Sequence, residues 1–194
     1  MRGRVRRGRV NRRDFRVKHY IACMIGGLFI LFQAGIAYGD GFAFSTWPKE
    51  AQIRVLANAK GRLYLLEVEQ GVGRRGTVVV RAGGFSYDSK RKDYTEEGSG
   101  TSIGFGGKYY FTGGMKGIYA GCGLDYFRAS IDWENPTDSG SATLSQLMPD
   151  IFAGYKILFY NKMSFEPSAM IGVISRDDEA EAVYGWGAAI GLRF

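Results

Sequence analysis

The chain has 194 residues, a formal net charge of +7 and 29 glycines, about twice the usual glycine content. This length suits one domain with its own core, and an aromatic content of 14% is too high for a disordered chain. The two cysteines, Cys23 and Cys122, exclude a disulfide scaffold and a Cys-x-x-Cys metal or redox site. The single histidine is His19, which lies ahead of an apolar segment.

The positive charge is concentrated at the N-terminus. Residues 1–39 hold nine lysines and arginines and one acid, which leaves 17 basic and 18 acidic residues in 40–194. The body of the chain is therefore close to neutral. A nucleic-acid partner, which a basic body would favour, is not expected.

An apolar segment of 17 residues, 21–37, follows the basic residues. A basic region, an apolar region and small residues in that order are typical of a signal peptide. Cleavage after Ala37 or Gly39 would start the mature protein at Tyr38 or Asp40, so we expect a signal peptide over 1–39 and a β-domain over 40–194. A membrane anchor is the alternative, because 17 apolar residues approach the length that spans a bilayer. Residues 11–18 also resemble a twin-arginine export motif, and either route leads out of the cytoplasm.

The remaining sequence alternates with a period of two, which is typical of strands. The pattern is clearest at 184–194, where large apolar residues occupy one face and mostly small residues the other. The small face suits the interior of a narrow barrel better than a solvated surface. The same alternation predicts strands at 62–69, 77–87, 101–111, 117–133, 144–159 and 164–175, with a weaker first strand at 52–58.

The expected connections alternate in length. Those at 71–76, 112–116 and 161–162 are short, whereas those at 88–100, 134–143 and 176–181 are longer and polar. Short turns at one end and longer loops at the other are typical of bacterial outer-membrane barrels with an even strand count. The sequence therefore predicts an all-β fold: a transmembrane, antiparallel, up-and-down β-barrel of eight strands in the bacterial outer membrane. The first outer turn, at 59–61, is short for this pattern.

Three segments carry a family resemblance: GTSIGFGGKYYFTGGMKGIYAGCGLDY at 100–126, FEPSAMIGV at 165–173 and YGWGAAIGLRF at 184–194. From about residue 62 to the end, the chain resembles the small eight-stranded barrels of the OmpA/OmpX superfamily, especially its uncharacterised glycine-rich members. The resemblance implies contacts with outer-membrane lipid and lipopolysaccharide, and a monomer. It also implies that the barrel-assembly machinery recognises the apolar residues of the last strand, namely Tyr184, Trp186, Ile190, Leu192 and Phe194. These families share architecture and little chemistry, so no single function is implied.

The main candidate site is the set of charged residues on the predicted inner face. An eight-stranded lumen is only wide enough for side chains to fill it, so these charges are expected to pair and to plug the barrel. A proton- or ion-conducting path is the alternative, and a catalytic carboxylate pair is the least favoured interpretation. The set is Glu67, Glu69, Arg81, Lys108, Asp125, Asp150, Lys156, Glu166 and Arg193.

Catalysis is not expected, because a mature chain without His19 has no imidazole to serve as a base. No catalytic residue, cofactor or metal site is assigned. Lys90, Arg91 and Lys92 are candidates for contact with lipopolysaccharide phosphates, and the acidic segment 177–181 for weak contact with divalent cations; ordinary solvated loops explain both groups. The sequence thus predicts a structural or surface-interaction role at the envelope. A narrow ion or small-solute channel is the first alternative, and a soluble periplasmic lipocalin-like carrier is the second.

Overall fold

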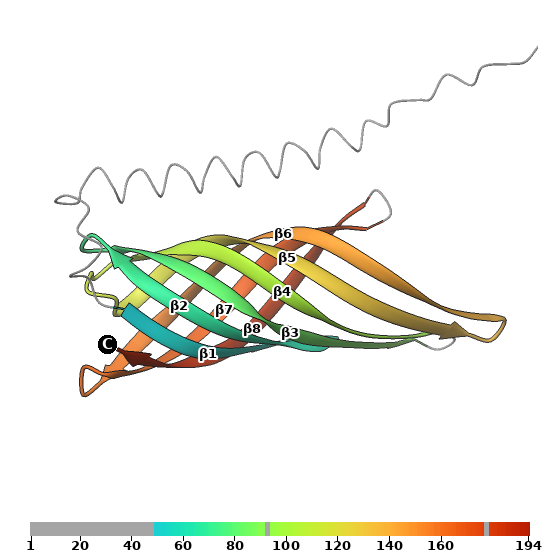
Figure 1. Ribbon diagram of the computed structural model, residues 1–194, viewed down its shortest axis with the longest axis horizontal. Coiled ribbons are helices and arrows are strands. Elements are labelled where there is room, and N and C mark those ends of the chain that lie inside the picture. Colours follow the sequence, from blue (N-terminus) through green and yellow to red (C-terminus); the bar gives the residue numbers. More distant parts are fainter. Residues whose placement is uncertain (1–48, 92–93, 177–178) are drawn as a thin grey trace, which may run out of the picture.

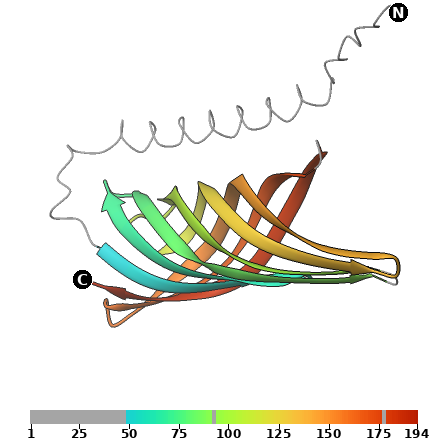
Figure 2. The same ribbon diagram turned by 45° about the vertical axis from the view of Figure 1, so that its right-hand side comes forward.

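Eight antiparallel strands pair in chain order, and the first also pairs with the last, so that the sheet closes into a barrel (Figures 1 and 2). The computed structural model describes residues 49–91, 94–176 and 179–194, so the expected signal peptide lies outside the described residues. Among the described residues, no helix is long and apolar enough to cross a membrane. The strands are β1 (Lys49–Ala57), β2 (Gly61–Val72), β3 (Gly76–Arg91), β4 (Tyr94–Tyr110), β5 (Gly117–Asn135), β6 (Asp138–Phe159), β7 (Met163–Arg176) and β8 (Glu179–Arg193).

Closure of the barrel depends on β1, the strand with the weakest sequence pattern. It pairs with β2 along its whole length and with β8 from Glu50↔Arg193 to Ala57↔Trp186. Two backbone hydrogen bonds between Lys49 and Phe194 extend this seam, with N···O distances of 3.2 and 2.9 Å. Over the length of β1 the sheet therefore has no free edge. The expectation of eight strands is confirmed.

The outer surface carries a belt of exposed apolar side chains. Ile53 on β1 is 66% exposed and Trp186 on β8 is 70% exposed, although both are large and apolar. Their sequence neighbours on the opposite face, such as Gln52 and Arg54, are buried in the lumen. Apolar residues outside and polar residues inside are the arrangement of a barrel that spans a lipid bilayer, not of a soluble carrier. The belt includes Val55, Leu66, Val68, Val80, Ile103, Phe105, Ile118, Leu147, Ile151, Tyr155, Ile171, Tyr184, Ile190 and Leu192.

The long outer loops expected from the sequence are wrong, because the chain continues there as paired strands. β3 and β4 stay paired up to Arg91↔Tyr94, and β5 and β6 up to Asn135↔Asp138. Above the belt the outward side chains face water, so their polarity marks a solvated strand as readily as a loop. The two ends of the barrel still differ, because the strands extend far beyond the membrane at one end only. β5 has 19 residues and β6 has 22, whereas roughly 10 are needed to cross a bilayer.

The outer rim is uneven, because β1 and β2 end early. Their connection is a tight turn in which the Asn58 side-chain oxygen accepts hydrogen bonds from the backbone N–H groups of Lys60 and Gly61, both at 2.8 Å. An asparagine that bonds to the backbone two and three residues ahead fixes a short turn locally. The β5–β6 hairpin projects well beyond this turn, and Figure 2 shows the β7–β8 hairpin rising separately from it.

A charge placed within the apolar belt tests the membrane-spanning assignment. Val80 and Ser86 point outward from the same strand, six residues apart, and Val80 lies between the exposed apolar residues Val68 and Phe105. We expect Val80→Arg to lower the free energy of unfolding in lipid vesicles by about 2–4 kcal/mol, the cost of a cation near the bilayer midplane. Ser86→Arg, above the belt, is expected to change it by less than about 0.5 kcal/mol. Denaturant unfolding followed by heat-modifiability gels measures both, and equal midpoints would contradict the assignment.

Candidate functional site

All nine charged residues predicted for the inner face lie in the lumen. Eight are buried, and the Arg193 side chain, at the end with the short turns, is 17% exposed. The structure divides them into two clusters. A main cluster surrounds Glu69 and Glu166, and a smaller one surrounds Arg81 nearer the outer end.

Two lysines join the two central carboxylates of the main cluster. The Lys108 Nζ lies 3.0 Å from Glu69 Oε2 and 2.8 Å from Glu166 Oε1. The Lys156 Nζ lies 2.6 Å from the same Glu69 oxygen, 3.1 Å from Glu166 Oε2 and 3.3 Å from Glu50 Oε2. Each lysine thus bridges β2 and β7 across the lumen. The attraction between charges paired in this way offsets part of the desolvation penalty that each of them incurs on burial.

Three members of the main cluster, Glu50, Gln52 and Arg54, come from β1, and they were not predicted from the sequence. The Arg54 Nε lies 2.9 Å from Glu67 Oε1, and the same guanidinium also contacts Glu166 and Ser168. The Gln52 side-chain amide donates to Glu50 at 2.8 Å and to Glu69 at 3.1 Å. The signal that could have found them is the alternation of Glu50, Gln52 and Arg54 with small and apolar residues.

Two buried tyrosines close the remaining space in the main cluster. Tyr110 donates its hydroxyl to Glu69 Oε1 and Tyr119 donates to Glu166 Oε1, both at 2.7 Å. The Lys108 ammonium lies 5.1 Å from the centre of the Tyr119 ring, and the Lys156 ammonium 5.5 Å from that of Tyr110, within cation–π range. Aromatic rings and ion pairs together fill the cross-section of the barrel at this level.

The smaller cluster consists of Arg81 between two aspartates. Its Nε donates to Asp125 Oδ1 at 2.8 Å, and another guanidinium nitrogen contacts Asp150. Glycines make room for it: a Cβ on Gly104 would collide with the Asp125 carboxylate, and one on Gly123 with the Arg81 guanidinium. Gly104 on β4 and Gly123 on β5 are therefore packing requirements of this cluster.

The charges of the main cluster balance. Among the described residues it contains the carboxylates Glu50, Glu67, Glu69 and Glu166 and the cations Arg54, Lys108, Lys156 and Arg193. Taken together, the two clusters draw on all eight strands. The chemistry that the arrangement supports is mutual neutralisation inside a narrow lumen.

The five residues predicted as an assembly signal lie on the outer face of β8. Tyr184, Trp186, Ile190, Leu192 and Phe194 are all largely exposed and belong to the apolar belt or its lower rim. Of the basic residues proposed for lipopolysaccharide, Lys90 is exposed beside Asp88 and Glu97, at 3.5 and 3.8 Å. Lys92 and residues 177–178 lie outside the described residues.

No protein-family model and no curated protein sequence matches this chain. Solved structures do match it. The N-terminal β-barrel domain of Pseudomonas aeruginosa OprF gives a TM-score of 0.57 at 15% identity, over 76% of this chain and 97% of that one. A major outer membrane protein from Thermus thermophilus gives 0.55 at 13%, over 77% and 100%. Ail, the attachment invasion locus protein of Yersinia pestis, gives 0.50 at 12%, over 76% and 97%.

These similarities establish the fold. The belt of exposed apolar side chains is the arrangement of a barrel that spans a lipid bilayer. The chain is an eight-stranded transmembrane β-barrel of the outer-membrane class. Its lumen holds the two clusters of ion pairs, and on one side its strands extend beyond the apolar belt.

Removal of one buried lysine tests the network. Lys108→Met keeps an apolar stem of similar length but leaves Glu69 and Glu166 with one cation fewer. We expect the free energy of unfolding to fall by about 3–5 kcal/mol, as for other broken buried pairs. Lys90→Met, at an exposed position, is the matched control and is expected to change it by less than about 0.5 kcal/mol. Overlapping urea transitions for the two variants would show that the network does not hold the barrel together.

Proposed function

We propose that this protein is a non-conducting, monomeric barrel in the bacterial outer membrane, with a structural or surface-interaction role at the outer face. The observation that carries the proposal is the lumen cross-section filled by Tyr110, Tyr119 and the ion pairs of Glu69 and Glu166. A filled lumen leaves the outer extension as the part that meets other molecules. No nucleic acid is expected among its partners.

The rim of the belt supports contact with lipopolysaccharide. Arg62 and Arg128 point outward, each two residues above an exposed tyrosine of the belt, Tyr64 and Tyr126. Lys90 is exposed higher on β3. Cations at this level suit the phosphate groups of an outer leaflet, because charge-assisted hydrogen bonds to phosphate are strong where lipid headgroups replace water.

A narrow channel is the rival function, and electrical recording separates the two. We expect the refolded protein to give no reproducible conductance steps in planar bilayers, because the lysine and tyrosine side chains of the main cluster occupy the lumen. Lys156→Met is the diagnostic variant, since Lys156 contacts three carboxylates at once. Conductance steps in the parent protein whose size changes in Lys156→Met would establish a channel and contradict the proposal of a non-conducting barrel.

The outward residues of β8 are proposed as the signal for the barrel-assembly machinery. Phe194 directly follows β8 and is 73% exposed, while its backbone pairs with Lys49. Recognition of the side chain can therefore be separated from closure of the barrel. Deletion of Phe194 would remove both, whereas a substitution removes the ring alone.

Phe194→Ser tests that proposal. We expect its yield of heat-modifiable barrel in cell membranes to fall several-fold, because the assembly machinery loses an apolar terminal group. Refolding of purified Phe194→Ser into detergent micelles should match the parent, since the Lys49 backbone pairing is retained. Phe159→Ser, an exposed phenylalanine at the same end of β6, is the control for general loss of lipid-facing area. An equal loss of membrane yield in both variants would argue against a specific role for Phe194.

A further inference from the structure

The two faces of the barrel exchange character above the membrane. On β5 the outward side chains up to Tyr126 are apolar or small, but those that follow, Arg128 and Ser130, are polar, while the inward ones, Phe127 and Ala129, become apolar. β6 does the same: Thr143 and Ser145 face outward there, and Leu144 and Met148 face inward. Polar residues outside and apolar residues inside are the pattern of a water-soluble barrel, the reverse of the pattern in the membrane part. We call this outer part of the barrel the outer cup.

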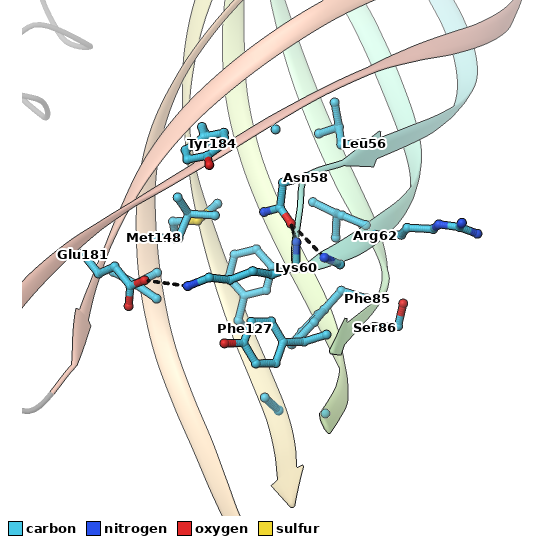
Figure 3. Close-up of a pocket in the computed structure, with 18 of the residues that line it drawn as sticks. Leu56, Asn58, Lys60, Arg62, Phe85, Ser86, Phe127, Met148, Glu181 and Tyr184 are labelled. Carbon is cyan, nitrogen blue, oxygen red and sulfur yellow. Dashed lines mark hydrogen bonds and ion pairs between the residues drawn. The ribbon is translucent and has the colours of Figure 1, made fainter. Parts of the chain in front are cut away.

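The inner face of this outer part lines a partly open, mainly apolar cavity of about 280 Å³ (Figure 3). Its floor is formed by Leu56, Met148 and Met170, which pack with Leu65 in a buried cluster between the cavity and the ion pairs below. Phe85 and Phe127, with ring centres 5.5 Å apart in an edge-to-face arrangement, form part of its wall. A concave, mainly apolar site of this size is at the lower end of the range for small-molecule pockets.

The cavity has a low wall on the side of the β1–β2 turn. Above this turn, β3 continues from Asp88 and β8 lies opposite, without β1 or β2 between them. Figure 3 shows Lys60 extending from the turn to Glu181 of β8, where their ion pair measures 3.4 Å, while Arg62 points away from the cavity. Both side chains of the pair are about half exposed. The wall of the cavity is therefore open to water on this side.

The polar groups at the cavity are already bonded to other parts of the protein. Asn58 accepts the two backbone bonds of its turn, Lys60 pairs with Glu181, and the Gln146 amide donates to the Ser175 carbonyl. Tyr87 donates to Glu96 at 3.4 Å. A charged ligand would have to displace one of these partners. The lining thus favours an uncharged solute.

We propose that the outer cup binds a small, uncharged, apolar molecule that enters from the aqueous side. A water-sized group occupies about 30 Å³ in a liquid and an apolar cavity of about 150 Å³ holds benzene, so 280 Å³ suits a molecule of roughly nine or ten heavy atoms. An acyl chain of membrane lipid is the less suitable occupant, because the outward residues at the level of the cavity, such as Ser86 and Ser145, are polar. The inference goes beyond the proposed function and does not depend on whether the lumen conducts.

Methyl NMR of the protein in lipid nanodiscs tests the proposal, because the methionines are placed as reporters. Met148 and Met170 line the cavity, Met163 is exposed on the lipid-facing side, and Met115 is buried in the turn between β4 and β5 at the opposite end. The probe is indole, and benzoate, which has the same number of heavy atoms but carries a negative charge, is the matched ligand. We expect indole to shift the Met148 and Met170 methyl signals to saturation and to leave Met115 unchanged, whereas benzoate shifts none of them.

Two variants fill the cavity from neighbouring strands. Ala129→Phe projects a ring inward from β5, and Leu144→Phe enlarges the facing residue on β6. Either is expected to abolish the saturable shifts, and Ser130→Phe, which points outward, is the control that should retain them. If neither filled variant folds, the comparison of the two probes in the parent protein decides.

Three results would overturn the proposal. The first is a shift of Met148 and Met170 that rises linearly with indole and follows Met163, which indicates partition into lipid alone. The second is an equal response of these two methyl signals to benzoate. The third is cross-relaxation between the Met148 methyl group and lipid chain protons in the absence of indole, which would assign the cavity to membrane lipid.

Discussion

The neutralisation of Glu69 and Glu166 is the constraint on which the rest of the barrel depends. An eight-stranded lumen offers these carboxylates little water, so each must be met by cations and hydrogen-bond donors from other strands. Lys108 and Lys156 reach both, and Tyr110 and Tyr119 supply one hydroxyl each. The small residues on the inner face follow from the same constraint, because long charged side chains need the space that glycines leave. Because these partners come from different strands, the pairs favour the strand register that brings them together.

The sequence was sufficient to predict the membrane part of the fold because one simple rule governs it. Alternation of apolar and polar residues identified the strands and placed Lys108, Asp150 and Glu166 in the lumen. The contribution of β1 was harder to see, since Glu50 and Arg54 find partners on β7, far along the chain, and the strand itself is short. A local pattern cannot show which distant strand will supply the partner.

The strands beyond the membrane were expected to be loops, because the outward residues there are polar and the inward residues apolar, the reverse of the membrane part. Residues such as Ser141 and Thr143 look like loop residues when the outward face is assumed to meet lipid. Once the strand has left the membrane, the outward face meets water and the inward face must become apolar to pack. Phe127, Ala129 and Leu144 carry this exchange without any break in the period of two. The position at which the faces exchange therefore marks the outer edge of the bilayer, and it also creates the apolar cup.

The seam between β1 and β8 has a consequence for the way in which the barrel forms. Its two strands are the first and the last described, so their pairing closes the longest loop in the chain and is the most costly contact in entropy. The charges on β1 remain without their β7 and β8 partners until that loop closes. An open sheet of eight strands, with β1 and β8 not yet paired, would thus carry two unpaired edges and uncompensated charge, and would gain little from partial order. Folding of this chain should accordingly be cooperative, with strand pairing and charge neutralisation completed in the same step.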